Sequence, residues 1–252
     1  MLDQHTVQRL REMHLTGMAD AFVAQAGQPD VQSLTFEERF GLLVDSEWTY
    51  RQSRKLRRLL KEAKLRLPAC IEDIDYDQPR GLDKAFIRTL GTGHWISSHQ
   101  NVLIDGPTGS GKTFLSCALA NAACRQGFSA RYYRLPRLLS ELPVARGDGS
   151  YPRLLGRLAK TDVLILDDWG LAPFTATESR DILEVLEDRS QARSTIIASQ
   201  LPVDRWHDTI ADPSVADAIL DRLVHNAHRL TLKGESMRKV NNNLGQPSTL
   251  GP

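Results

Sequence analysis

Apolar residues in the first 68 positions recur at the spacing of amphipathic helices. The first apolar series, which includes Leu10 and Phe22, is interrupted at Gly27 and Pro29. Thr35 and Glu38 then form the pattern of a capping box at the start of a second, longer helix. We expect that helix to keep its spacing up to residues 67–68, where proline stops it. The pattern predicts a small all-helical domain over residues 1–68.

After residue 68, short apolar runs alternate with helical stretches, which is typical of a parallel sheet with crossover helices. The expected strands are residues 101–105, 130–135, 163–167, 195–199 and 229–232. The expected helices between them are residues 112–125, 137–141, 178–192 and 215–227. The pattern predicts an α/β domain over residues 69–240, with a parallel five-stranded sheet flanked by helices. The polar residues 241–252 are expected to form a disordered tail.

The composition is that of an ordinary globular protein, with 252 residues, 41% hydrophobic and 25% charged. No apolar stretch approaches the roughly 20 residues that a membrane helix needs, and the first thirty residues hold no signal-peptide core. The three cysteines include no C-x-x-C pair, which argues against a disulfide framework or a zinc site. We therefore expect a cytoplasmic protein without a membrane partner.

The formal net charge of +1 conceals a strongly basic stretch at residues 51–66. This stretch contains a single acid, Glu62, and eight bases: Arg51, Arg54, Lys55, Arg57, Arg58, Lys61, Lys64 and Arg66. A local basic helix of this kind favours a polyanionic partner, and duplex DNA is the partner we predict. A solvated face or a protein-binding face is the alternative interpretation of the same charges.

A phosphate-binding motif decides the class of the second domain. Residues 106–113 read G-P-T-G-S-G-K-T, between a predicted strand and a predicted helix, and match G-x-x-x-x-G-K-[ST] at every fixed position. The glycines let backbone N–H groups turn toward a phosphate, and the helix N-terminus adds its dipole. Lys112 is predicted to reach the β- and γ-phosphates, and Thr113 to offer its hydroxyl to Mg²⁺. The predicted ATP-binding residues here are Gly106, Pro107, Thr108, Gly109, Ser110, Gly111, Lys112, Thr113 and Phe114.

A second acidic motif follows the apolar run at residues 163–166. Asp167 and Asp168 stand at the carboxyl end of this strand, where ligands bind in open α/β sheets. Two adjacent carboxylates repel each other unless a cation joins them, so Mg²⁺ is the physical complement. Asp167 is predicted to hold Mg²⁺ with Thr113, and Asp168 to orient or deprotonate the attacking water.

The sequence resembles the IstB family, the ATP-binding transposition helpers of insertion sequences, over about residues 1–240. The resemblance rests on the basic helical N-terminus, L-P-A-C-I-E-D-I-D-Y at 67–76, the phosphate-binding motif, L-I-L-D-D-W-G at 164–170, A-S-Q-L-P at 198–202, D-R-L at 221–223 and G-E-S-M-R at 234–238. It implies an initiator-type AAA+ ATPase, related to the helicase loader DnaC, with little or no lid domain. It also implies ATP- and DNA-dependent self-assembly, deformation of target DNA, and recruitment or stimulation of a transposase.

The resemblance assigns roles to residues outside the two motifs. Gln200, with Ser199 as the second choice, corresponds to the polar residue that contacts the γ-phosphate or its water in AAA+ proteins. Arg222 resembles the arginine finger that a neighbouring subunit inserts into the ATP site, and Arg238 is a candidate sensor of phosphates in its own subunit. Four further residues are implied: Ile74 and Tyr76 beside adenine, and Arg134 and Arg137 along the DNA backbone.

Two other functions compete with this interpretation. A helicase loader would use its N-terminal region to dock a helicase, and a small-molecule P-loop kinase would have no obvious role for Arg222 or the basic helix. One departure from many AAA+ enzymes is Asp168, which stands where a glutamate is usual. The shorter side chain favours slow hydrolysis, suited to a switch rather than a motor.

Overall fold

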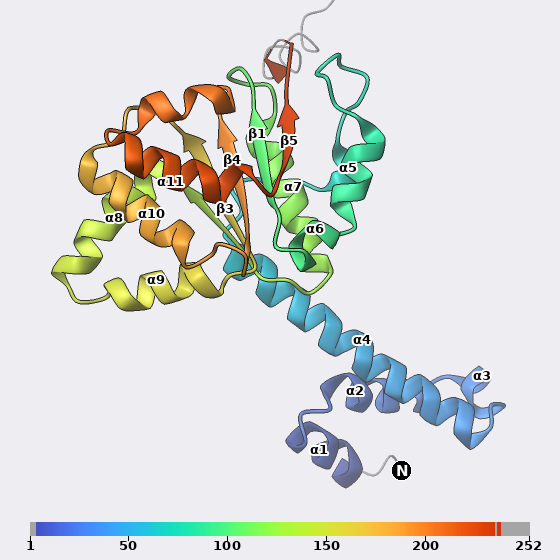
Figure 1. Ribbon diagram of the computed structural model, residues 1–252. Helices are drawn as coiled ribbons and strands as arrows, with labels where there is room; N and C mark the ends of the chain where they lie inside the picture. Colours follow the sequence, from blue (N-terminus) through green and yellow to red (C-terminus); the bar gives the residue numbers. More distant parts are fainter. Residues whose placement is uncertain (1–3, 235, 238–252) are drawn as a thin grey trace, which may run out of the picture. The chain divides into compact units, whose positions relative to one another are not determined.

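The computed structural model describes residues 4–234 and 236–237 and divides the chain into two compact units, Met1–Arg58 and Leu59–Pro252 (Figure 1). The division into units falls after Arg58, and the predicted domain boundary at residue 68 stays a prediction. Arg238 and the predicted disordered tail at residues 241–252 lie outside the described residues. Among the described residues, no helix is long and apolar enough to span a membrane.

The first unit is helical, as predicted. Its elements are α1 (Gln4–Glu12), α2 (Thr16–Ala26), α3 (Pro29–Gln32) and the first part of α4 (Phe36–Ala63). Helices α2 and α4 pack so closely at Gly17 that a Cβ atom there would lie 2.6 Å from Tyr50 Cβ. The predicted capping box is confirmed: Thr35 N donates to Glu38 Oε2 at 2.8 Å, and Glu38 N donates to Thr35 Oγ1 at 3.3 Å.

Helix α4 ends earlier than its apolar spacing predicts. The helix stops at Ala63, and Lys64 adopts a left-handed backbone conformation with φ of +49°. The expected stop at Pro68 is therefore wrong, because the chain leaves the helix before proline can act. The segment from Lys64 to Pro68 is instead an irregular stretch that leads into the second unit.

The second unit is built on a parallel five-stranded sheet in the order β2-β3-β4-β1-β5. Its strands are β1 (Asn101–Asp105), β2 (Ala130–Arg134), β3 (Val163–Trp169), β4 (Ser194–Ser199) and β5 (Ala227–Thr231). The predicted fold class is confirmed. Strand β1 lies between β4 and β5, so the loop that follows β1 starts from the interior of the sheet.

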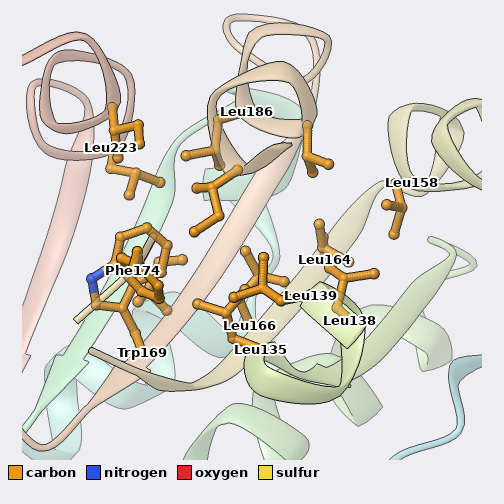
Figure 2. Close-up of a cluster of buried hydrophobic side chains, with 14 of the residues drawn as sticks. Leu135, Leu138, Leu139, Leu158, Leu164, Leu166, Trp169, Phe174, Leu186 and Leu223 are labelled. Carbon is orange, nitrogen blue, oxygen red and sulfur yellow. The ribbon is translucent and has the colours of Figure 1, made fainter. Parts of the chain in front are cut away.

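Helices cover both faces of the sheet. Helix α7 (Lys112–Arg125) packs on one face, and the other carries α8 (Leu135–Gly147), α9 (Tyr151–Lys160), α10 (Ala176–Glu187) and α11 (Pro213–Val224). Successive side chains of β2 face the two opposite layers: Tyr132 packs beside α7, and Tyr133 packs against the core on the other face. In that core, Leu164 and Leu166 of β3 meet leucines of α8, and Trp169 contacts Phe174 (Figure 2).

Several helical segments escaped prediction. They are α5 (Lys84–Gly91), α6 (His94–Ser97), α9 and the 3₁₀ turns η1 (Ile71–Asp73), η2 (Val203–Arg205) and η3 (His207–Thr209). Helix α8 also continues past Pro143, although proline removes a backbone donor. Leu142 and Ala145 on either side are buried in the core, so packing overrides the local signal. Strand β5 begins two positions before the predicted strand, at Ala227.

Candidate nucleotide-binding site

The phosphate loop connects β1 directly to the N-terminus of α7. Gly109 and Gly111 have φ values of +83° and +103°, a region that L side chains rarely adopt. A Cβ atom at Gly109 would lie 2.0 Å from Ser236 Oγ, so space also requires glycine there. The loop therefore holds the backbone in the turned conformation that an anion-binding cradle needs.

Lys112 lies over the inside of this loop. Its Nζ donates to the carbonyl oxygens of Gly106 at 2.7 Å and Pro107 at 2.8 Å, and the residue is only 9% exposed. Burial lowers the pKa of the ammonium group. The Oγ of Ser110 is buried and has no hydrogen-bond partner among the described residues. A phosphate would supply both groups with a charged acceptor, so the loop fits the predicted ligand.

The carboxylate of Asp167 completes a candidate metal site. Asp167 is 2% exposed, and its Oδ2 accepts hydrogen bonds from Thr113 Oγ1 at 2.8 Å and Tyr132 OH at 2.7 Å. A hydroxyl and a carboxylate side by side are hard oxygen ligands, and Mg²⁺ needs only one or two of these besides phosphate and water. The residues therefore fit the predicted ion, with Thr113 and Asp167 brought together from α7 and β3.

Asp168 adopts an unusual backbone conformation at the end of β3. Its φ is +64°, and the pairing of β3 with β4 shifts register between Leu166 and Trp169. Irregularities of this kind re-aim side chains beside active sites. The carboxylate of Asp168 is one-fifth exposed and accepts from Arg134 Nε at 2.7 Å. Arg134, which the sequence predicted to bind DNA, thus forms an ion pair with an acidic residue of the nucleotide site.

The two polar residues at the carboxyl end of β4 lie in different environments. Gln200 Oε1 accepts from Thr108 Oγ1 of the phosphate loop at 2.8 Å, and Gln200 lines the same cavity as Lys112. Ser199 is buried, and its hydroxyl donates to Trp169 O at 2.9 Å. The choice left open by the sequence therefore favours Gln200 on position. The cavity as a whole is lined by Arg66, Leu67, Thr108, Gly109, Gly111, Lys112, Thr113, Phe114, Arg134, Asp167, Asp168, Gln200 and Met237.

Residues 8–245 match the family described as IstB-like ATP binding protein. The chain belongs to that family. An insertion sequence ATP-binding protein of Sinorhizobium fredii is 51% identical over 239 residues, which cover 95% of this chain and 98% of the relative. One from Mycobacterium tuberculosis is 32% identical over 230 residues, covering 91% and 92% of the two chains. The protein is thus an ATP-binding protein of the insertion sequence type.

Solved structures with the same fold come from replication proteins. The DnaC helicase loader has a TM-score of 0.57 at 20% identity, covering 68% of this chain and all of its own. DnaA bound to AMPPCP and single-stranded DNA has a TM-score of 0.58 at 15% identity, covering 72% and 55%. At these identities the likeness establishes the AAA+ P-loop fold of the IstB-like chain and nothing further.

Three residues of the IstB-like site had escaped prediction. Arg80 is 5% exposed, its Nη1 donates to Ser110 O at 3.3 Å and its Nη2 to Asp75 O, so it braces the phosphate loop. Tyr132 and Arg66 lie beside Asp167. No motif marks Arg80 or Tyr132, while Arg66 was visible in the sequence only as one base of a basic stretch.

The two residues predicted beside adenine do not line this cavity. Ile74 is 6% exposed and belongs to the core, while the ring of Tyr76 is contacted by Lys84, whose Nζ lies 5.3 Å from the ring centroid. The same segment nevertheless reaches the phosphate loop through Arg80. Contact of Ile74 and Tyr76 with adenine stays a prediction.

Arg222 lies at the amino-terminal ends of the strands, whereas the phosphate loop lies at their carboxyl ends. Its carbonyl accepts from Asn101 Nδ2 at 3.0 Å, and Asn101 is the first residue of β1, whereas the loop follows the last. A five-residue strand spans about 16 Å at roughly 3.3 Å per residue. The guanidinium of Arg222 pairs with Glu187 and donates to Ala218 O at 2.8 Å. The IstB-like chain therefore does not bring Arg222 to its own Lys112.

The predicted DNA-binding bases of α4 fall into two groups. Arg51 is engaged, because its Nε donates to Glu47 Oε1 at 2.7 Å and that carboxylate is buried. The other five are exposed and form no ion pair with any described residue: Arg54, Lys55, Arg57, Arg58 and Lys61. Arg137 is likewise exposed, on α8. Most of the basic stretch of this family member is thus free for an external anion.

Proposed function

We propose that this protein is an ATP-dependent DNA-binding regulator of transposition, which assembles on and deforms target DNA and recruits or stimulates a transposase. The observation that carries the proposal is the combination, in one chain of the insertion sequence ATP-binding family, of a phosphate-binding loop beside the Thr113–Asp167 pair with an exposed basic helix. The phosphate site supplies the switch, and the basic helix supplies affinity for a polyanion.

Hydrolysis of ATP is assigned to residues of the cavity. Thr113 and Asp167 would hold Mg²⁺, which supplies charge neutralisation on the β- and γ-phosphates when bound. Lys112 would exchange its two loop carbonyls for phosphate oxygens. Asp168 would orient the attacking water and accept its proton, and Gln200 would contact the water or the γ-phosphate. Because Arg134 pairs with Asp168, the base must leave that ion pair before it acts, which favours slow turnover.

Arg222 is proposed to complete the ATP site of a neighbouring copy. Arg222 lies at the amino-terminal ends of the strands, away from the ATP site of its own chain. Its Nε has no hydrogen-bond partner among the described residues. A guanidinium supplied in trans can contribute roughly 10³ to 10⁵ in phosphoryl-transfer rate. Hydrolysis should then depend on assembly, and ATPase activity per subunit should rise with protein concentration or with DNA.

Mixing two inactive variants tests the role of Arg222. Lys112→Ala cannot bind ATP but keeps the arginine, while Arg222→Ala binds ATP but lacks the arginine. We expect each alone to be inactive and the mixture with DNA to regain part of the ATPase activity. Parental turnover by Arg222→Ala alone would contradict the assignment.

Binding to duplex DNA tests the function itself. The protein is mixed with linear duplex DNA in ATP, in ADP and without nucleotide, and is followed by fluorescence anisotropy and electron microscopy. We expect ordered assemblies on DNA in ATP and their loss in ADP, and DNA in those assemblies that is bent or shortened. Absence of DNA binding in every nucleotide state would exclude the proposal and direct attention to a protein target such as a helicase.

A further inference from the structure

Arg66 reaches the nucleotide cavity from the irregular segment that follows α4. Its Nη1 lies 4.0 Å from Asp167 Oδ2, and the side chain is 42% exposed. The hydroxyl of Tyr132 donates to the same carboxylate oxygen at 2.7 Å, so the two side chains meet at Asp167. A permanent cation thus stands beside the predicted metal ligand, on a part of the chain that belongs to neither nucleotide motif.

The backbone that carries Arg66 is fixed to α7. Burial raises the pKa of the Cys117 thiol, and the backbone N–H groups of Leu67 and Arg66 beside it act in the opposite direction. Leu65 packs with Phe114 against buried residues of α7, in the same small cluster as Tyr132. Because α7 begins with Lys112 and Thr113, this anchoring fixes Arg66 relative to the phosphate loop.

The carboxylate oxygen next to Arg66 already accepts two hydrogen bonds from other side chains. Asp167 Oδ2 accepts from Thr113 at 2.8 Å and from Tyr132 at 2.7 Å, and the guanidinium remains outside hydrogen-bond distance at 4.0 Å. A divalent cation held by Thr113 and Asp167 would add positive charge beside the guanidinium. Arg66 then needs a different anion, and the terminal phosphate of ATP is the one that arrives in the same cavity.

We propose that Arg66 contacts the terminal phosphate of bound ATP and thereby discriminates ATP from ADP, with Tyr132 as the side chain that positions it. The inference rests on the ATP site proposed above. A guanidinium binds phosphate oxygens through a planar fork of donors, which a lysine cannot reproduce. ATP, unlike ADP, would then hold the segment between α4 and the core through Arg66.

The test compares the affinities of a non-hydrolysable ATP analogue and of ADP by calorimetry, for the full chain with Mg²⁺. Arg66→Gln should lower affinity for the ATP analogue about tenfold, the value of one hydrogen bond to a charged group, and change ADP affinity less than twofold. Arg66→Lys should fall between Arg66→Gln and the parent. Lys64→Gln, which removes a charge two residues away, is the matched control and should leave both affinities unchanged. Equal unfolding temperatures establish that the variants fold.

Titrations without Mg²⁺ separate a contact to phosphate from an effect on Asp167. We expect Arg66→Gln still to lose discrimination between the two nucleotides in EDTA, because the proposed contact is to phosphate. A loss that occurs only with Mg²⁺ would overturn the inference and assign Arg66 to the metal ligand. Equal losses for ATP analogue and ADP, or no loss for either, would overturn it as well.

Tyr132→Phe tests the positioning role, since it removes only the hydroxyl. We expect about a threefold loss of discrimination, smaller than that of Arg66→Gln, and no further loss when both substitutions are combined. Additive losses in the double variant would overturn the positioning role. A parental chain that binds neither nucleotide would instead contradict the ATP site itself, so the two failures are distinguishable.

Discussion

The nucleotide site and the basic stretch of α4 differ in how their positive charges are compensated. In the nucleotide site three cations stand next to protein oxygens: Lys112 donates to two loop carbonyls, Arg134 donates to Asp168, and Arg66 lies 4.0 Å from Asp167. These groups are held at fixed distances by the ends of the strands and by α7. Such a site recognises one geometry, because a ligand must replace specific partners.

In α4, five exposed bases have no ion-pair partner among the described residues. Water and counterions hydrate them, and a nucleic acid gains affinity mainly by releasing counterions. The contrast shows two uses of charge in one chain. The preorganised site should be selective and insensitive to salt, whereas the helix should be tolerant of sequence and sensitive to salt.

The largest expected effect belongs to Asp168→Asn, which tests the geometric half of the contrast. ATP turnover should fall by roughly 10² to 10⁴, because an amide cannot accept the proton of the attacking water. ATP affinity should stay within about threefold, since Thr113 and Asp167 are untouched. Turnover is measured in the presence of DNA, and affinity by a fluorescent nucleotide. Asp188→Asn, an exposed acid at the end of α10, is the control, and parental turnover by Asp168→Asn would exclude the assigned role.

Lys112→Ala should act on affinity instead. Loss of the ammonium removes charged contacts to two phosphates, so ATP affinity should fall about a hundredfold or more. The fold should survive, because the Lys112 ammonium donates to two carbonyls of its own loop and to no other described residue. Lys160→Ala, an exposed lysine of α9, is the matched control. If Lys112→Ala retained parental affinity in the fluorescent-nucleotide assay, the loop would not be the phosphate site.

The parts of the site that the sequence predicted are those where local backbone and charge decide the outcome. The phosphate loop requires glycines, a lysine and a hydroxyl at fixed spacing, so the spacing alone identifies Gly111, Lys112 and Thr113. The apolar run that ends in Asp167 and Asp168 can likewise be identified from the local sequence alone. Helix α7 begins and ends at the predicted residues, because the motif fixes one end and its apolar face the rest.

The parts that were missed depend on contacts between distant segments. Arg80 meets Ser110 across 30 positions, and Tyr132 meets Asp167 across 35, with no periodic pattern linking either pair. Arg134 was assigned to DNA through the family resemblance and its charge, because a sequence does not display its partner, Asp168. Short helices such as α5 carry too few turns for a periodic signal. Tertiary packing, rather than local propensity, determined these features.

The smallest expected effect comes from the other half of the contrast, the exposed bases. Arg54, Arg57 and Arg58 changed together to Ala should weaken binding to all duplex sequences alike, about tenfold at moderate salt. Each phosphate contact contributes about −0.9 to the slope of log affinity against log salt, so the slope should become shallower by about 2.7. The measurement is fluorescence anisotropy with duplex DNA at several salt concentrations.

The matched control for this variant removes three positive charges from the second unit, at Arg88, Lys160 and Arg180, all exposed. It has the same net charge, so a general loss of attraction would lower both slopes equally, whereas contacts made by α4 lower only the first. ATP affinity of the α4 variant should stay parental, because none of its three residues lines the nucleotide cavity. A parental salt slope would mean that the basic helix faces a partner other than DNA. The claim that α4 binds DNA through exposed, unpaired charges would then be wrong.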